Sequence, residues 1–405
     1  MKKLLIYSSL FILSSSLAFA QQDSGFTNKG EARNELANGL KEGKWIEFLD
    51  YNKKPTTNSD GEYYTLTVYR AGKANGIKRY YSKDGILLDE SPFKDDIRNG
   101  LVKEYYENGR VKGKFPYWDG KENGTATEFY DDGKLKREAS YTEGALNGIV
   151  REYDENGVLK SETYYVNDII NGYEKLYYEN GALESETTYR NNNKDGIERD
   201  YYESGKLKVQ FPFTNGIENG IVREYYESGV LMHEFPYVNG LEDGLQKEFY
   251  ESGKLKAEFP YKKGKLQGKG TRYFETGEME SFTNYKNGLR EGTEKDYYQN
   301  GTVRVQFPFH HDMEDGKVKE YYESGKIKNV FPFTHDKENG VVIEYYESGK
   351  EKAEFTYKMG VLDGVAKAFD ETGKQTSETI YSNGNVLSFK TFDAQPVKPN
   401  DRLDF

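Results

Sequence analysis

Apolar and polar residues alternate along this chain in a pattern that returns every 24 residues. Glycine stands at residue 76 and at every 24th residue from there to 364, and a second glycine follows nine residues after each. With the first glycine counted as position 0, positions 5 and 17 are aromatic in all thirteen units, and position 11 is aliphatic or methionine in eleven. A fixed period of this length is typical of repeat architectures. The stretch from Gly244 to Gln267 represents the unit.

Each unit is predicted to form one β-hairpin. Positions 1–6 form a short strand, and positions 7–9, mostly Glu-Ser-Gly or Glu-Asn-Gly, suit a three-residue loop with a left-handed glycine. Positions 10–17 alternate apolar and polar residues, as a half-buried strand does. Because a lone hairpin cannot bury its apolar side, neighbouring units are expected to stack. The predicted fold is therefore all-β: an elongated, solenoid-like array of stacked β-hairpins, with about 14 repeats in a single twisted sheet.

Charged residues predict the register of the two strands. In most units an acidic residue at position 4 is matched by Lys or Arg at position 12, as in Glu248 and Lys256, so these positions are expected to lie opposite each other. Positions 5, 11, 15 and 17 would then form the core face, and positions 4, 6, 10, 12 and 14 the other face. The seven prolines of the array all stand at position 16, where pairing is expected to stop. Position 20 is always Gly, Asp or Asn, which tolerate a left-handed backbone.

The pattern divides the chain into five segments. The first begins Met-Lys-Lys, continues with an apolar run and ends Ala18-Phe19-Ala20, which is typical of a secretory signal peptide. A segment before the regular array resembles a unit with nine extra residues, as terminal repeats often do. The predicted segments are a signal peptide (residues 1–20), an N-terminal lead segment (21–42), an irregular N-terminal capping repeat (43–75), the regular hairpin repeats (76–390) and a flexible C-terminal tail (391–405).

Composition and charge narrow the range of functions. The chain has 36 Tyr and 23 Phe, an aromatic content that favours strands. Without Lys2 and Lys3 the 57 basic residues fall to 55 against 68 acidic ones, and the resulting net charge of −13 argues against nucleic acid as a partner. The chain contains no cysteine, so an exported form relies on no disulfide. No segment after the signal peptide is apolar enough to predict a transmembrane helix.

The unit resembles the MORN-variant repeat of bacterial proteins, a relative of the membrane occupation and recognition nexus repeat. Gly220-Ile-Val-Arg-Glu-Tyr-Tyr-Glu-Ser-Gly229 is a close example, and the resemblance covers roughly residues 36–390. It implies a β-hairpin array that serves as a scaffold or binding surface. Some members of the family are antitoxins, whereas exported members with long arrays look like surface or host-contact proteins of Gram-negative bacteria.

Neither a catalytic site nor a cofactor site is predicted. His310 and His311 are neighbours beside Asp312, but the sequence offers them no third ligand, so we expect no metal site. His311 and His335 share position 19 of successive units, and about 10 Å between them is too far for one zinc ion. Paired acidic residues lie in predicted turns, and no nucleophile stands with a base. The chain is therefore expected to be no enzyme.

The best candidate for binding is a row of tyrosines at position 6. Its members are Tyr106, Tyr130, Tyr178, Tyr202, Tyr226, Tyr250, Tyr298, Tyr322 and Tyr346. Tyrosine offers a large ring with a polar tip, which suits peptides and glycans, although the rings could instead pack on their copies one unit away. We therefore expect an exported, non-catalytic protein, at the cell surface, secreted or periplasmic, that binds a protein or glycan at the cell envelope or on a host cell. The alternative is a periplasmic scaffold or antitoxin-like protein with one protein partner.

Overall fold

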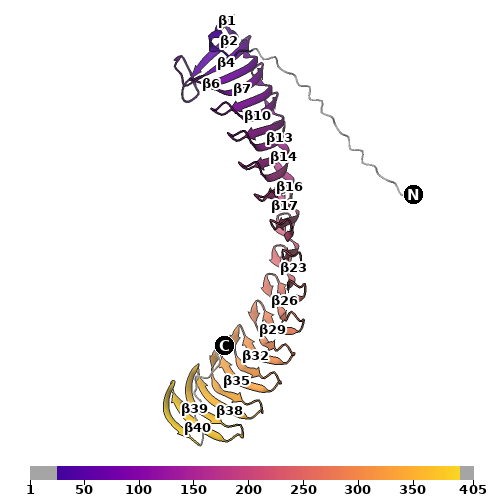
Figure 1. Cartoon of the computed structure of the whole chain (residues 1–405), viewed down its shortest axis with the longest axis vertical. Helices are drawn as coiled ribbons and strands as arrows, with labels where there is room; N and C mark the ends of the chain where they lie inside the picture. The colour runs from indigo at the N-terminus through magenta and orange to yellow at the C-terminus, as the bar shows by residue number, and fades with distance from the viewer. Residues whose placement is uncertain (1–24, 393–405) are drawn as a thin grey trace, which may run out of the picture. The chain divides into compact units, whose positions relative to one another are not determined.

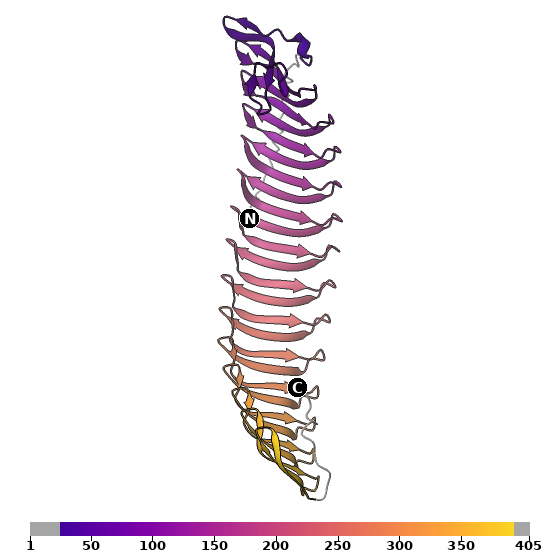
Figure 2. The same cartoon turned by 90° about the vertical axis from the view of Figure 1, so that its left-hand side faces the viewer.

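The computed structural model describes residues 25–392, which form 41 antiparallel strands in one open sheet. These residues include one 3₁₀ turn, η1 (Lys29–Glu31), and no α-helix. The described residues divide into two compact units. One ends at Asn192, the other begins at Asn193, and each is a stack of hairpins (Figures 1 and 2). The prediction of an all-β hairpin array is confirmed. The predicted signal peptide and residues 393–405 of the predicted tail lie outside the described residues.

Three kinds of strand recur in the regular units. The first strand starts at position 0: β6 (Gly76–Ser82), β9 (Gly100–Tyr105), β12 (Gly124–Phe129), β19 (Gly196–Tyr201), β22 (Gly220–Tyr225), β25 (Gly244–Phe249), β28 (Gly268–Tyr273), β31 (Gly292–Tyr297), β34 (Gly316–Tyr321) and β37 (Gly340–Tyr345). The second strand covers positions 11–18: β7 (Leu87–Lys94), β10 (Val111–Trp118), β13 (Leu135–Thr142), β15 (Leu159–Val166), β17 (Leu183–Arg190), β20 (Leu207–Thr214), β23 (Leu231–Val238), β26 (Leu255–Lys262), β29 (Met279–Lys286), β32 (Val303–His310), β35 (Ile327–Thr334), β38 (Glu351–Lys358) and β40 (Gln375–Ser382).

The third strand has two residues, at positions 21 and 22, in the link for which no strand is predicted. Its copies are β8 (Ile97–Arg98), β11 (Lys121–Glu122), β18 (Asn193–Lys194), β21 (Ile217–Glu218), β24 (Leu241–Glu242), β27 (Lys265–Leu266), β30 (Leu289–Arg290), β33 (Met313–Glu314) and β36 (Lys337–Glu338). In three places it is continuous with the next first strand, as β14 (Ala145–Tyr153), β16 (Ile169–Tyr177) and β39 (Val361–Phe369). The last strand is β41 (Asn385–Thr391).

The link is itself a tight turn. Position 20 has a positive φ in all thirteen units, as predicted, and so has position 19, for example Lys263 (φ 50°) before Gly264 (φ 75°). Two successive left-handed residues make the two-residue turn that matches the twist of antiparallel strands. Position 19 escaped prediction because it is often Asn or Asp but also Glu143, Lys263 or Met359.

A one-residue bulge determines which side chains share a face. Phe249 lies opposite Leu255, but Glu248 lies opposite Ala257, so Lys256 at position 12 is an extra residue. The same shift occurs in all thirteen regular hairpins. The extra residue inverts the alternation of side chains between positions 11 and 13.

The bulge makes two predictions wrong. Positions 5 and 11 lie on one face, whereas positions 15 and 17 lie on the other with positions 2 and 13. Position 4 lies opposite position 13 rather than position 12. The face with positions 2, 13, 15 and 17 holds the core of the second compact unit, whose buried residues are Val305, Val318, Phe331, Val342, Ala353, Phe355, Ala366 and Tyr381.

Five of the predicted ion pairs form all the same, because the side chain of the extra residue reaches position 4. Their N–O distances are 2.6–3.7 Å, in Lys112–Glu104, Lys256–Glu248, Arg304–Asp296, Lys328–Glu320 and Lys352–Glu344. Glu128 and Glu152 instead lie 3.2 and 3.9 Å from the guanidinium of Arg137. The charge pattern thus correctly predicted which strands pair, but the predicted register differs by one residue from the observed one.

The N-terminal segments form an irregular end to the sheet. Its strands are β1 (Glu35–Ala37), β2 (Leu40–Leu49), β3 (Pro55–Thr56), β4 (Tyr63–Arg70) and β5 (Lys73–Ala74). Phe26 of the lead segment is fully buried against Tyr64, Leu66 and Tyr81, and its carbonyl accepts a 3.1 Å hydrogen bond from Arg79. The lead segment therefore covers the face that carries position 5, although its sequence showed no pattern.

Candidate binding surface

The tyrosine row lies where each first strand enters its hairpin loop. Tyr250 donates its main-chain N–H to the carbonyl of Lys254 (2.8 Å) and accepts from Gly253 (2.8 Å), which closes the predicted three-residue loop. All nine side chains are half-buried. The structure therefore places the row along the loop edge of the sheet, on the same face as positions 2 and 4.

The hydroxyl groups of this row join successive units. In eight tyrosines the hydroxyl donates to the main-chain oxygen at position 5 of the next unit, over 2.7–2.9 Å. Tyr250, for example, donates to Tyr273. The ninth member, Tyr178, also has an interaction partner. The polar tip is thus bound within the array, while part of each ring stays accessible.

Charged side chains accompany the rings. The ammonium group of Lys256 lies 5.8 Å from the ring centroid of Tyr250 and 2.6 Å from the carboxylate of Glu248. The lysines at position 12 of two other units, Lys136 and Lys208, take the same place over their tyrosines, also at 5.8 Å. Ring, cation and acid therefore form one composite surface that repeats along the array.

Three units without an aromatic residue at position 6 explain what this position must do. Asp154 accepts hydrogen bonds from the N–H groups of Asn156 and Val158 (both 2.8 Å), and Asp370 accepts from Thr372 and Lys374 in the same way. Ser82 accepts from Ile86 at 3.2 Å. A short polar side chain here caps its own loop, whereas tyrosine reaches the next unit, so position 6 orders the loop edge in either case.

The opposite face carries a second set of charge contacts. Position 3 is usually Lys or Arg and position 14 usually Glu, and they pair as in Arg151–Glu162 (2.7 Å) and Arg223–Glu234 (3.0 Å). The hydroxyl of Tyr273, at position 5, donates to Glu258 of the preceding unit (3.0 Å). The recurrence of Arg and Glu at these positions was visible in the sequence, but the predicted register did not bring them together.

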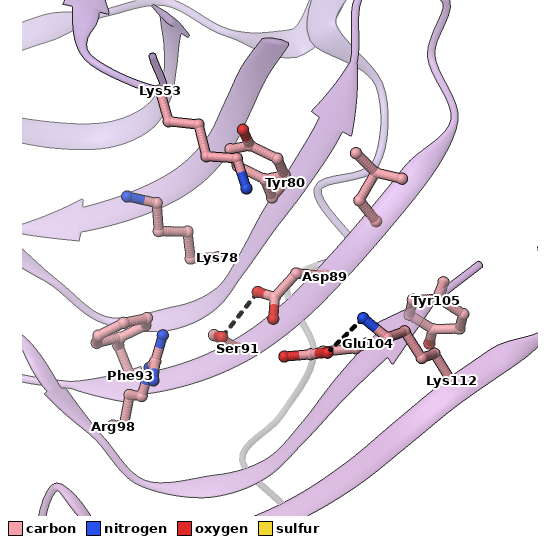
Figure 3. Close-up of a pocket in the computed structure, with 11 residues that line it drawn as sticks. Lys53, Lys78, Tyr80, Asp89, Ser91, Phe93, Arg98, Glu104, Tyr105 and Lys112 are labelled. Carbon is pink, nitrogen blue, oxygen red and sulfur yellow. Dashed lines mark hydrogen bonds and ion pairs between the residues drawn. The ribbon is translucent and has the colours of Figure 1, made fainter. Parts of the chain in front are cut away.

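A cavity of about 530 Å³ lies beside the capping repeat (Figure 3). Lys53 of the irregular segment, Tyr80 of β6, Asp89 of β7 and Lys112 of β10 contribute to its lining. Ser91 donates a 2.7 Å hydrogen bond to Asp89, and Glu104 pairs with Lys112 at 3.7 Å. The sequence could not predict this cavity, because it depends on where the nine extra residues of the capping repeat fold.

Burial controls the electrostatics of this cavity. It raises the pKa of Asp89, against the hydrogen bond from Ser91 and the charge of Arg98. It also raises the pKa of Tyr80 to about 12, with a further contribution from Tyr63. Within the described residues the Tyr80 hydroxyl has no hydrogen-bond partner. This hydroxyl is itself buried, so the accessible polar groups of the cavity are its charged side chains, and charges of both signs suit a polar group such as a sugar or a peptide main chain.

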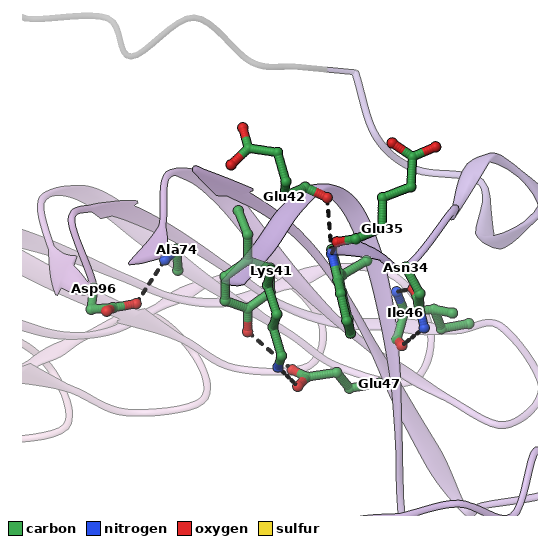
Figure 4. A network of polar contacts seen from close by, with 10 residues as sticks. Asn34, Glu35, Lys41, Glu42, Ile46, Glu47, Ala74 and Asp96 are labelled. Carbon is green, nitrogen blue, oxygen red and sulfur yellow. Dashed lines mark hydrogen bonds and ion pairs between the residues drawn. The ribbon is translucent and has the colours of Figure 1, made fainter. Parts of the chain in front are cut away.

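Side chains close the N-terminal edge of the sheet (Figure 4). The amide of Asn34 donates to the carbonyl of Ile46 (3.1 Å) and accepts from its N–H (2.8 Å), as a neighbouring strand would. The indole of Trp45 donates to the carbonyls of Glu35 (3.1 Å) and Glu42 (2.9 Å). These contacts satisfy main-chain groups that an open edge would expose.

One group of side chains in the described part of the chain has donors suited to a metal ion. Glu291, His310 and His311 each place one such atom within 4.8 Å of the others. The sequence predicted no metal site at the two histidines because it offered them no third ligand, and the structure places Glu291 beside them as a third donor. His233 instead lies 2.9 Å from Glu224 within its own hairpin.

Fold and contacts together define a β-hairpin repeat protein whose units are joined through main-chain and side-chain hydrogen bonds. The family model described as MORN repeat variant matches more than half of the chain, over residues 98–119, 122–143, 146–167, 170–191, 194–215, 218–239, 242–263, 290–311, 314–335 and 338–359. The chain therefore belongs to the MORN repeat variant family. In the described residues no helix is long and apolar enough to cross a membrane.

Comparison with other proteins adds little beyond the family. No curated protein matches the chain. A chain in the crystal structure of TcdB2-TccC3-Cdc42 is 11% identical, with 86% of this chain and 23% of that chain covered and a TM-score of 0.15. A chain in the structure of the Photorhabdus luminescens Tc holotoxin pore is 12% identical, with 84% of this chain and 18% of that chain covered and a TM-score of 0.15. The chain thus spans less than a quarter of the length of these two chains.

Proposed function

We propose that this protein is exported and non-catalytic, and that it presents its repeated sheet surface to a protein or glycan at the cell envelope or on a host cell. The observation that supports this most is the composite surface of ring, cation and acid at positions 6, 12 and 4. The three residue types stand together in seven of the thirteen regular units, and neighbouring units lie about 10 Å apart. A macromolecule with its own repeat can contact many such units at once, and linked weak contacts add up to high avidity. Surface adhesion and host contact are functions of this kind.

Export rests on the signal peptide predicted at residues 1–20. The non-catalytic part of the proposal rests on the ion pairs, which join the same positions in several units and therefore have a structural role. A catalytic constellation would instead interrupt the repeat with residues found at one place.

A periplasmic scaffold or antitoxin-like protein with a single protein partner is the alternative. The cavity beside the capping repeat favours it, since Lys53 and the irregular segment make that cavity a feature of one place rather than of every unit. Protease treatment of intact cells separates the two. Degradation of the protein on intact cells agrees with surface display, and protection in a soluble periplasmic pool agrees with the alternative.

The tyrosine row can be tested directly. In the chain from residue 21 onwards, Tyr226, Tyr250 and Tyr298 are replaced together by Ala or, in a matched variant, by Phe. Co-sedimentation with the envelope fraction of the source cells measures binding, and far-UV circular dichroism measures folding. We expect the Ala variant to lose at least about tenfold in affinity, because ring contacts contribute about 1 kcal/mol or more each. The Phe variant keeps the rings and should bind as the parent does. Equal binding by a folded Ala variant would remove the row from the proposal.

A further inference from the structure

Position 23 of several units reaches the turn of the next unit. Its side chain accepts a hydrogen bond from the N–H of position 19 there, as Gln267 does from Asn287 (2.9 Å) and Asn339 from Met359 (3.4 Å). It also contacts position 18, as Asp243 does with Lys262 (2.9 Å). The repeat therefore holds one acceptor side chain beside two successive side chains of the following turn.

In one place these positions are occupied by metal-binding residues. Glu291 stands at position 23, and His310 and His311 stand at positions 18 and 19 of the next unit. The N–H of His311 donates to a Glu291 carboxylate oxygen at 3.1 Å, which orients the carboxylate in the way the repeat provides. His335 also occupies position 19, but Thr334 precedes it, so the paired imidazoles are specific to the earlier turn.

The donor atoms are spaced for a small transition-metal ion. His310 Nε2 lies 3.0 Å from His311 Nδ1, and the two rings are nearly perpendicular, at 87°. The Glu291 carboxylate lies 3.1 Å from His310 Nδ1 and 3.8 Å from His311 Nδ1. The two contacts of His310 use different nitrogens of its ring, and only one of these can bind a given ion. With one donor atom from each residue, the three atoms lie within 4.8 Å of one another. A tetrahedral zinc ion with ligands at about 2.1 Å separates its donors by about 3.4 Å, so small side-chain rotations bring the three donors to that spacing.

Charge and exposure around the cluster allow a cation to approach. The neighbouring cationic side chain of Arg290 lies 3.5 Å from Asp312, which offsets its charge. All three donor side chains reach solvent, so an ion can enter.

We infer that Glu291, His310 and His311 form a zinc site in which three protein donors leave one coordination position for water or for a donor from a partner. Two imidazoles and one carboxylate are a ligand set that zinc accepts. The ion ties the turn after β32 to the residue between β30 and β31, and so links successive units. This inference does not depend on the proposed binding function.

Calorimetric titration of the untagged chain from residue 21 with zinc sulfate tests the site. We expect one ion per chain with micromolar or tighter affinity. His310→Ala, His311→Ala and Glu291→Gln should each weaken binding by at least about 30-fold, since even outer partners of a metal site contribute 10- to 100-fold. His335→Ala, the matched control at position 19, should bind as the parent does.

Two results would overturn the inference. One is binding only at millimolar zinc, which marks an ordinary pair of surface histidines. The other is unchanged affinity in Glu291→Gln, which shows that the carboxylate is not a ligand. The replaced side chains are half-buried or exposed, so the variants are expected to fold, and a far-UV spectrum equal to the parent's checks this.

Discussion

Among single residues, the glycine at position 0 is the one whose place in the structure most strictly requires glycine. It is not a turn residue: it lies in the bulge between the third strand of one unit and the first strand of the next. Gly244 has φ 138°, and a Cβ there would lie 2.8 Å from Pro236 Cγ. Proline has no N–H to donate, and at position 16 this costs no ladder hydrogen bond. The bulge interrupts pairing with the next unit at this point, whereas pairing with the first strand of the same hairpin continues. The predicted place of the prolines is thus correct on one side of the strand.

Replacing this glycine should cost more than replacing a loop glycine. Gly229, at position 9, has φ 90°, and a Cβ added there would meet no atom within 4 Å, so Gly229→Ala should cost about 1 kcal/mol for the left-handed backbone alone. Gly244→Ala adds the clash with Pro236 and should cost at least about 2 kcal/mol. Urea unfolding followed by circular dichroism compares the two. Equal losses would show that the contact with proline is unimportant.

On the scale of elements, charge contacts tie three strands together at Glu162. Its carboxylate accepts from Arg151 of β14 (2.7 Å) and from the hydroxyl of Tyr173 of β16 (2.8 Å). Burial opposes its ionisation, but the hydrogen bonds from Tyr173 and Arg151 outweigh burial and lower the pKa of Glu162 below its ordinary 4.5. A carboxyl group with a lowered pKa stabilises the fold above its unfolded pKa, and this contribution is lost as the pH falls through the folded value.

The Glu162→Gln variant should therefore show a stability loss that depends on pH. At pH 7 we expect it to be less stable than the parent by about 1 kcal/mol, the usual worth of a partly buried charged hydrogen bond. Below pH 4 the difference should shrink, because the parent's carboxyl becomes protonated. Urea midpoints at both pH values measure this. Glu143→Gln, in the exposed pair with Lys121 (3.0 Å), is the control and should change little at either pH. A constant gap for Glu162→Gln would contradict this role of the carboxylate.

The same scale shows how far the sequence predicts the structure. Strands, loops and the left-handed position 20 followed from local chemistry. Glycine recurs at positions 0 and 9, aromatic residues at positions 5 and 17, and Gly, Asp or Asn at position 20, in every regular unit. The faces did not follow, because the bulge at position 12 leaves no mark of its own: Lys256 reads as an ordinary strand residue. The fold of Phe26 onto Tyr81 also escaped prediction, since one aromatic residue in a polar segment has no period.

The candidate sites were predictable to a smaller degree. The tyrosine row was visible as a period, but its hydroxyl contacts depend on the separation of successive units, as from Tyr250 to the carbonyl of Tyr273. The pairing of Glu291 with His310 and His311 joins residues about twenty apart through two tight turns. Such a contact requires the register of the link, which includes the third strand that the sequence did not indicate.

On the scale of the whole molecule, we expect function to be a property of repetition. Regular units contact their sequence neighbours through strand pairing and, where position 6 is tyrosine, through its hydroxyl, so removal of a whole 24-residue unit should let the flanking units pair in the same register. Removal of half a unit would bring a second strand where a first strand belongs and should disrupt the array.

The most direct measurement is the affinity for the envelope fraction of chains that lack two or four whole units, taken from different parts of the array. We expect the shortened chains to fold, with affinity falling step by step and depending on the number of units removed rather than on which ones. Full affinity in every shortened chain, or complete loss on removal of one particular pair of units, would place binding at a single site and contradict the proposal that repetition carries it.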